Sequence, residues 1–70
     1  MNTNNPLVGQ FYFGFKQEVN EIVAQVNRDH MLVAQYGKIG EPVAKYIVPL
    51  SRLQGYKLYP SIEAMMEGAA

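Results

Sequence analysis

The chain contains no cysteine, so neither a disulfide nor a thiolate metal site can hold it together. Its single histidine, His30, leaves a zinc ion without most of the nitrogen and sulfur ligands that zinc takes in proteins. A domain of 70 residues buries only about 60% of the surface that its unfolded chain exposes. We therefore expect no metal and no other cofactor, and we expect self-association as a homodimer to supply the missing stability.

Net charge and long apolar runs are also missing. Six basic and six acidic residues cancel, which removes the simplest electrostatic argument for nucleic acid or an anionic membrane as a partner. No run approaches the roughly 18 apolar residues of a membrane helix, and the N-terminus lacks the features of a signal peptide. The expectation is a cytoplasmic protein without membrane contact. The charges are unevenly spread, because residues 38–57 are basic and their flanks are acidic.

The N-terminal part shows a change in composition. Residues 1–9 are polar and rich in asparagine, with proline and glycine breakers, and they predict a flexible arm ahead of one small helical domain, 10–70. Phe11, Phe13 and Phe15 then alternate, which places three rings on one face of an extended segment. That segment is either a short strand or a clamp lying over the helices. The rings either belong to the core or form an exposed interface.

Residues 16–36 predict the longest helix. Apolar or weakly polar side chains recur there at spacings of three and four, the pattern of a helix with one buried face: Val19, Ile22, Val23, Val26, His30, Val33 and Ala34. Asn27 and Asp29 are better caps than interior residues, so the alternative is a break there and a second helix that begins at His30. His30 is interpreted as a satisfied, partly buried side chain, because no nucleophile pattern accompanies it.

The middle of the chain predicts a turn and a further helix. Gly37–Gly40 is the turn, and a helix follows from Glu41, since proline at position 42 is tolerated in a first turn. Pro49 is unfavourable inside a helix. Either this helix kinks near Val48, or residues 44–50 form a strand instead.

The C-terminal part predicts a turn at 54–55, an extended stretch over Tyr56–Tyr59 and a last helix with Ser61 as its cap. Taken together, these elements predict a mainly α fold. It is a small helical domain of about three helices, with a short extended or β segment near the N-terminus.

Residues 33–47 resemble the core of helix-turn-helix DNA-binding domains. Ala34 matches the small residue at which two helices of that family cross, and Ile39 matches the apolar residue that plugs the turn. The family's turn glycine falls at the position of Lys38, whereas this chain has Gly37 one position earlier. Further along, residues 55–66 are similar to the small wing and final helix of phage excisionase-type domains.

The resemblance implies a non-enzymatic transcription regulator of phage or plasmid type, which binds duplex DNA as a homodimer. A recognition helix would enter the major groove and the nearby cations would hold phosphates. The implied DNA-binding residues are Lys38, Glu41, Lys45, Tyr46, Arg52 and Lys57.

The alternative is a protein-protein interaction module that binds a host protein and inhibits or adapts it. Near-neutral charge and many aromatic residues favour such a surface, and its candidate interface residues are Phe11, Phe13, Phe15, Tyr56 and Tyr59. A third interpretation is a structural subunit of a larger particle. The sequence contains no nucleophile pattern, phosphate loop or dinucleotide fingerprint, so we expect neither catalysis nor a small-molecule substrate.

Overall fold

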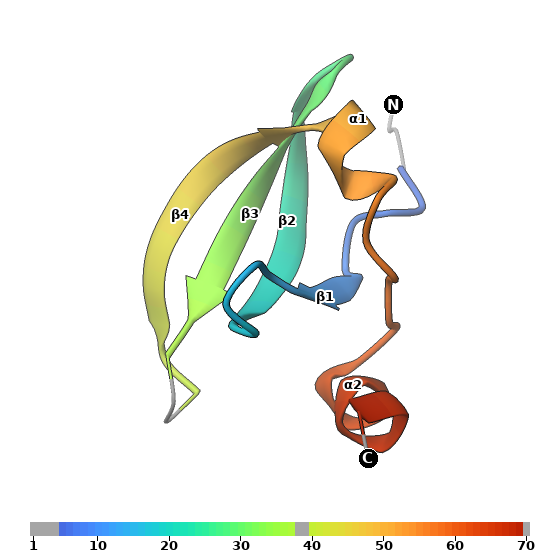
Figure 1. The fold of residues 1–70 in the computed structure, drawn as a ribbon. Coiled ribbons are helices and arrows are strands. Elements are labelled where there is room, and N and C mark those ends of the chain that lie inside the picture. Colours follow the sequence, from blue (N-terminus) through green and yellow to red (C-terminus); the bar gives the residue numbers. More distant parts are fainter. Residues whose placement is uncertain (1–4, 38–39, 70) are drawn as a thin grey trace.

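The computed structural model describes residues 5–37 and 40–69, and it shows a mainly β fold (Figure 1). Four antiparallel strands lie side by side in chain order: β1 (Phe11–Phe13), β2 (Val19–Asn27), β3 (His30–Tyr36) and β4 (Pro42–Pro49). Two short helices follow the sheet, α1 (Leu50–Leu53) and α2 (Ile62–Ala69). The prediction of a mainly α fold with about three helices is therefore wrong, although the short strand near the N-terminus is present.

A β-hairpin replaces the long helix predicted over residues 16–36. β2 pairs with β3, and the two residues between them form the hairpin loop. Asn27 closes this turn, because its Oδ1 accepts a hydrogen bond from the backbone N–H of Asp29 at 2.9 Å and lies 3.0 Å from Nδ1 of His30. The valines and isoleucine of the segment suit a strand. The chain reverses where the sequence indicated a break.

The segment predicted as a recognition helix is an edge strand. The backbone N–H of Leu50 donates to the carbonyl of Asp29 at 2.8 Å, and Pro49 faces His30 in the β3–β4 register. In an antiparallel ladder, a hydrogen bond between the neighbours of two facing residues means that the facing residues themselves exchange none. His30 and Pro49 are therefore a non-hydrogen-bonded pair, and the backbone nitrogen of Pro49 points away from β3. The ladder loses no hydrogen bond there, and for that reason an edge strand tolerates the proline.

The helix-turn-helix resemblance is overturned by these strands. Ala34 lies inside β3 rather than at a helix crossing, and the residues that follow position 41 form β4. Lys38 and Ile39, predicted in the turn, lie outside the described residues. The likeness of residues 55–66 to excisionase-type domains is overturned as well, because the chain folds as a four-stranded antiparallel sheet with two short helices and not as a helical domain.

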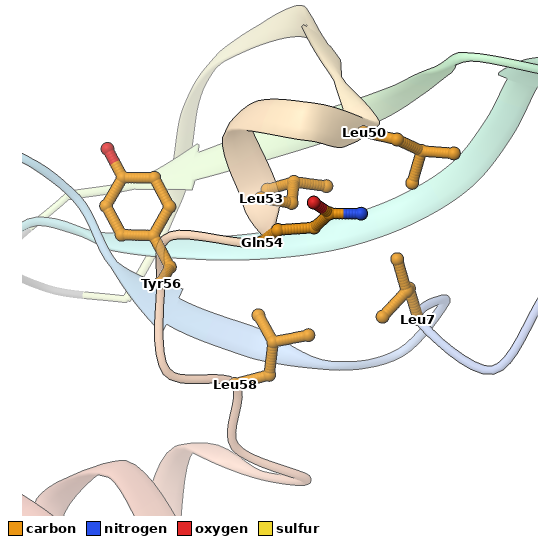
Figure 2. Close-up of a pocket in the computed structure, with 6 residues that line it drawn as sticks. All are labelled: Leu7, Leu50, Leu53, Gln54, Tyr56 and Leu58. Atoms are coloured by element: carbon orange, nitrogen blue, oxygen red, sulfur yellow. The ribbon is translucent and has the colours of Figure 1, made fainter.

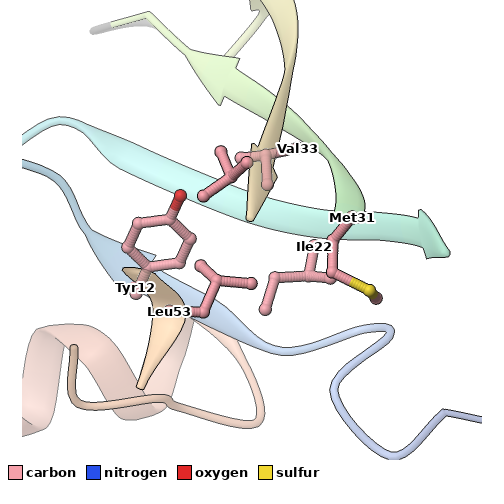
Figure 3. Close-up of a cluster of buried hydrophobic side chains, with 6 residues drawn as sticks. Tyr12, Ile22, Met31, Val33 and Leu53 are labelled. Carbon is pink, nitrogen blue, oxygen red and sulfur yellow. The ribbon is translucent and has the colours of Figure 1, made fainter. Parts of the chain in front are cut away.

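The core lies between the sheet and α1 (Figure 3). Its members come from all four strands and from α1, and each is at most 2% exposed: Tyr12, Ile22, Met31, Val33, Val48 and Leu53. Burial of an aliphatic side chain of this size contributes about 1.5–3 kcal/mol. The core therefore holds α1 against the sheet.

Both ends of the described chain are tied to the sheet. Within the segment predicted as an arm, the N–H of Gly9 donates to the carbonyl of Ile22 at 2.8 Å. Near the other end, Phe11 and Tyr59 exchange two backbone hydrogen bonds of 2.8 Å, so the C-terminal segment pairs with β1. Ser61 caps α2 as predicted, because its Oγ accepts from the N–H of Ala64 at 3.0 Å. Neither described helix is long and apolar enough to cross a membrane.

Candidate functional site

The turn between β1 and β2 holds one phenylalanine in solvent. The N–H of Gly14 donates to the carbonyl of Glu18 at 2.8 Å, and the N–H of Gln17 donates to the carbonyl of Gly14 at 3.0 Å. The turn requires glycine at position 14, because a Cβ there would fall on the Glu18 carboxylate and lie 2.6 Å from Nδ2 of Asn20. At the outside of this turn, Phe15 is 92% exposed.

A second turn, at the end of α1, places Tyr56. The carbonyls of Arg52 and Leu53 accept hydrogen bonds of 3.1 Å from the N–H groups of Gly55 and Tyr56. The ring of Tyr56 then stacks on Tyr12, with centroids 4.7 Å apart and planes inclined by 36°. Because Tyr12 belongs to the core, this stacking fixes the position of the Tyr56 ring.

These two turns together form a first hollow, of about 550 Å³. Its lining is Phe15, Arg52, Gly55 and Tyr56, and we call it the aromatic hollow. Arg52 is exposed, so the hollow combines two aromatic rings with a cation at the surface. A guanidinium of this kind binds carboxylates through paired hydrogen bonds and also stacks on aromatic faces.

The structure contains a second hollow, of about 310 Å³, whose lining residues are drawn in Figure 2. Its lining comes from the N-terminal segment, from α1 and from the segment after α1: Leu7, Leu50, Leu53, Gln54, Tyr56 and Leu58. We call it the aliphatic hollow. Tyr56 lines both hollows, so the two hollows adjoin at this residue.

Buried hydroxyl groups lie next to this surface. Tyr46 donates a hydrogen bond of 2.6 Å from its hydroxyl to Oδ1 of Asn20, which is fully buried. Burial raises the pKa of Tyr12 above its usual value, and a hydrogen bond with Tyr46 raises it further. Burial likewise raises the pKa of Tyr46. The hydroxyl group of Tyr46 therefore acts as a structural donor to Asn20.

The predicted DNA-binding residues in β4 and directly before it do not share one face. Glu41 and Lys45 are exposed, whereas Tyr46 is half-buried and directs its hydroxyl inward to Asn20. Lys38 lies outside the described residues. No helix presents Lys45 and Tyr46, because residues 42–49 form a strand.

The other two predicted DNA-binding residues lie beyond the sheet. Arg52 is on α1 and lines the aromatic hollow. Lys57 is exposed, with its Nζ 5.3 Å from the ring centroid of Tyr59 in a cation–π arrangement.

The five aromatic residues predicted as a partner interface fall into two groups. Phe15 and Tyr56 meet in the aromatic hollow. Phe13 and Tyr59 pack edge to face with centroids 6.0 Å apart, and Phe11 is half-buried beside them in the bridge to Tyr59. In the first group Phe15 faces solvent and Tyr56 is half-buried against the core, whereas the second group belongs to the packing around β1.

Sequence reasoning missed the leucines of the aliphatic hollow. Four of the five leucines in the chain line it: Leu7, Leu50, Leu53 and Leu58. Two of these leucines come from opposite ends of the sequence, so no local spacing indicates that they meet. Over the residues that the structure describes, no group of three histidine or carboxylate side chains is arranged to hold a metal ion.

The chain matches no protein-family model, and comparisons with curated proteins and with solved structures find no match either. The class of protein is therefore defined by the fold and the site: a small antiparallel β domain with two adjoining surface hollows.

Proposed function

We propose that this chain is a small non-catalytic domain that binds a partner protein, and that an extended segment of the partner lies across the aromatic and aliphatic hollows. The observation that carries the proposal is Phe15, which is 92% exposed beside Tyr56 and Arg52. A ring of this size left in water forgoes the roughly 1.5–3 kcal/mol that its burial contributes. A partner that covers Phe15 obtains that contribution as binding free energy.

The linings indicate the chemistry of the partner segment. The aliphatic hollow, lined by four leucines, suits one aliphatic side chain. The aromatic hollow suits an apolar contact with Phe15 and a carboxylate that reaches Arg52. Tyrosine and arginine are also the residue types that most often dominate protein-protein binding energy.

Selection from a displayed library of random peptides tests this proposal. We expect enriched peptides to share an aliphatic residue and an acidic residue. Binding of the consensus peptide, followed by fluorescence polarisation, should weaken at least about tenfold in Phe15→Ala, because tenfold corresponds to about 1.4 kcal/mol. Arg52→Ala should weaken it less, since an exposed ion pair contributes about 0.2–1 kcal/mol.

Val26→Ala is the matched control, because Val26 is 47% exposed and lies in β2, outside both hollows. It should leave the affinity for the consensus peptide unchanged. Failure to enrich any peptide, or enrichment of peptides that bind Phe15→Ala and the unchanged chain equally well, would contradict the proposal.

A further inference from the structure

The outer edge of β4 is a second surface, separate from the two hollows. β4 pairs with β3 alone, and no described residue forms a strand on its other side. Figure 1 shows β4 along one border of the sheet. The backbone groups on that side are therefore open to another strand.

The register identifies the groups that this edge offers. Pro49 and His30 form a non-hydrogen-bonded pair. From there, the pairs of the β3–β4 ladder are alternately hydrogen-bonded and non-hydrogen-bonded. Tyr46 and Val48 bond to β3, whereas the N–H and C=O groups of Lys45 and Ile47 point outward. Pro49 has no N–H to offer, so it limits the edge on that side.

The side chains beside these open groups are apolar apart from one cation. Ile47 is 56% exposed and Val43 is 53% exposed. Ile47 pairs with Leu32, which pairs in turn with Ala24, so an apolar row runs inward from the edge across three strands. Lys45, also exposed, is the charged residue within β4.

Lys45 distinguishes between possible occupants of the edge. If two copies paired through the open groups around a two-fold axis, Lys45 would face Val43, Lys45, Ile47 or Pro49 of the other copy, depending on the register. In the first three registers the two lysines are opposite or diagonal neighbours, and like charges on facing strands are unfavourable. The fourth register loses a hydrogen bond, because Pro49 has no N–H, and none of the four gives Lys45 an anion. A strand with a carboxylate opposite Lys45 matches the edge better.

We propose that the edge of β4 accepts an antiparallel strand from a partner protein, with an acidic residue opposite Lys45 and an apolar residue opposite Ile47. Since the strands run in opposite directions, the partner meets Ile47 first. Its sequence pattern is therefore apolar, any residue, acidic. Backbone hydrogen bonds supply the attachment and the carboxylate selects the partner.

Titration of the full isotope-labelled chain with two synthetic β-strand peptides tests this inference. Both peptides alternate threonine with isoleucine or valine, and they differ only in a glutamate or a lysine two positions after one isoleucine. We expect amide shifts at Lys45 and Ile47, and a preference of about fivefold for the glutamate peptide, the upper range for one cross-strand charge pair. Lys45→Glu should invert the preference.

Two matched variants separate the possible causes. Lys57→Glu makes the same charge change on the segment after α1 and should preserve the preference for the glutamate peptide. Phe15→Ala should leave strand binding unchanged, so failure of the two-hollow proposal and failure of this one are distinguishable. Equal binding of the two peptides, shifts confined to the hollows, or a dimer that forms through β4 in sedimentation experiments would overturn the inference.

Discussion

At the scale of single residues, Asn20 links strands that are not neighbours. It is fully buried in β2, and its Oδ1 accepts the hydroxyl hydrogen bond of Tyr46 from β4, at 2.6 Å, with β3 between the two strands. Its Nδ2 donates to the carbonyl of Glu18 at 3.4 Å. This hydrogen-bonded group spans the inner face of the sheet and therefore helps to hold the sheet curled around its core.

Tyr46→Phe should lower the free energy of unfolding by about 1–3 kcal/mol, because it leaves the buried Oδ1 of Asn20 without its donor. Tyr36→Phe is the matched control. Its hydroxyl also makes a hydrogen bond of 2.6 Å, to Glu21, but a carboxylate on the outer face is reached by water. We therefore expect a smaller decrease in the free energy of unfolding for Tyr36→Phe than for Tyr46→Phe. Urea denaturation measures both decreases, and equal values would contradict this role of Asn20.

We predict that ionisation of tyrosine side chains lowers the stability of the fold at alkaline pH. Burial raises the pKa of Tyr12 and that of Tyr46, and a hydrogen bond to Glu21 raises the pKa of Tyr36. In each case the folded-state pKa lies above the unfolded value of about 10. The stabilisation is therefore complete below about pH 10, and it is lost as the pH rises toward the folded values, since the unfolded chain releases its protons first.

Urea denaturation from about pH 8 to about pH 11 measures this loss, which amounts to at most about 1.4 kcal/mol per pH unit for the buried Tyr12 and to less for the two more exposed tyrosines. Tyr12→Phe should reduce the slope above pH 10 while all lysines are retained. An unchanged slope in that variant would show that lysine deprotonation, rather than tyrosine ionisation, drives the alkaline loss.

At the scale of elements, β4 combines two hydrogen-bonding roles in alternate residues. Its inward groups bond to β3, and its outward groups meet water. Prolines at both ends and Lys45 near the middle are typical of protected edge strands. They limit uncontrolled pairing and leave a short open stretch for a matched partner.

Amide hydrogen exchange should reveal this alternation. In the free chain, the N–H groups of Lys45 and Ile47 should exchange much faster than those of Tyr46 and Val48, because only the latter bond to β3. Two-dimensional NMR in deuterated buffer measures the four rates. Uniform protection along β4 would mean that the edge is already covered.

At the scale of the whole molecule, the small core sets a narrow stability margin. Six side chains from five elements form it, and no cysteine is present to reinforce it. The homodimer that the composition predicts stays a prediction, and sedimentation at several concentrations tests it. The two proposed surfaces use different elements, so a partner on one leaves the other accessible.

The sequence indicated local features well and extended features poorly. The turn at 54–55, the strand at Phe11–Phe13 and the Ser61 cap are recognisable in the sequence, because adjacent residues determine them. At 27–29 the sequence indicates a break between two helices, and the structure has the turn of a hairpin there. The hairpin segment resembles a helix in sequence because two register shifts, after Ile22 and after Gln25, interrupt the alternation of β2. With the period of two broken, its apolar residues also fit a spacing of three and four.

For the candidate site, the residue types in the sequence were sufficient to single out Phe15, Tyr56 and Arg52, although Arg52 was assigned to DNA. Whether residues 42–49 formed a helix or a strand depended on pairing with β3, which short-range preference does not decide. The aliphatic hollow likewise exists only because the C-terminal segment returns to β1 and brings distant leucines together. Turn chemistry is a property of neighbouring residues, whereas strand pairing and hollows arise from contacts between distant ones, so only the tertiary structure decides them.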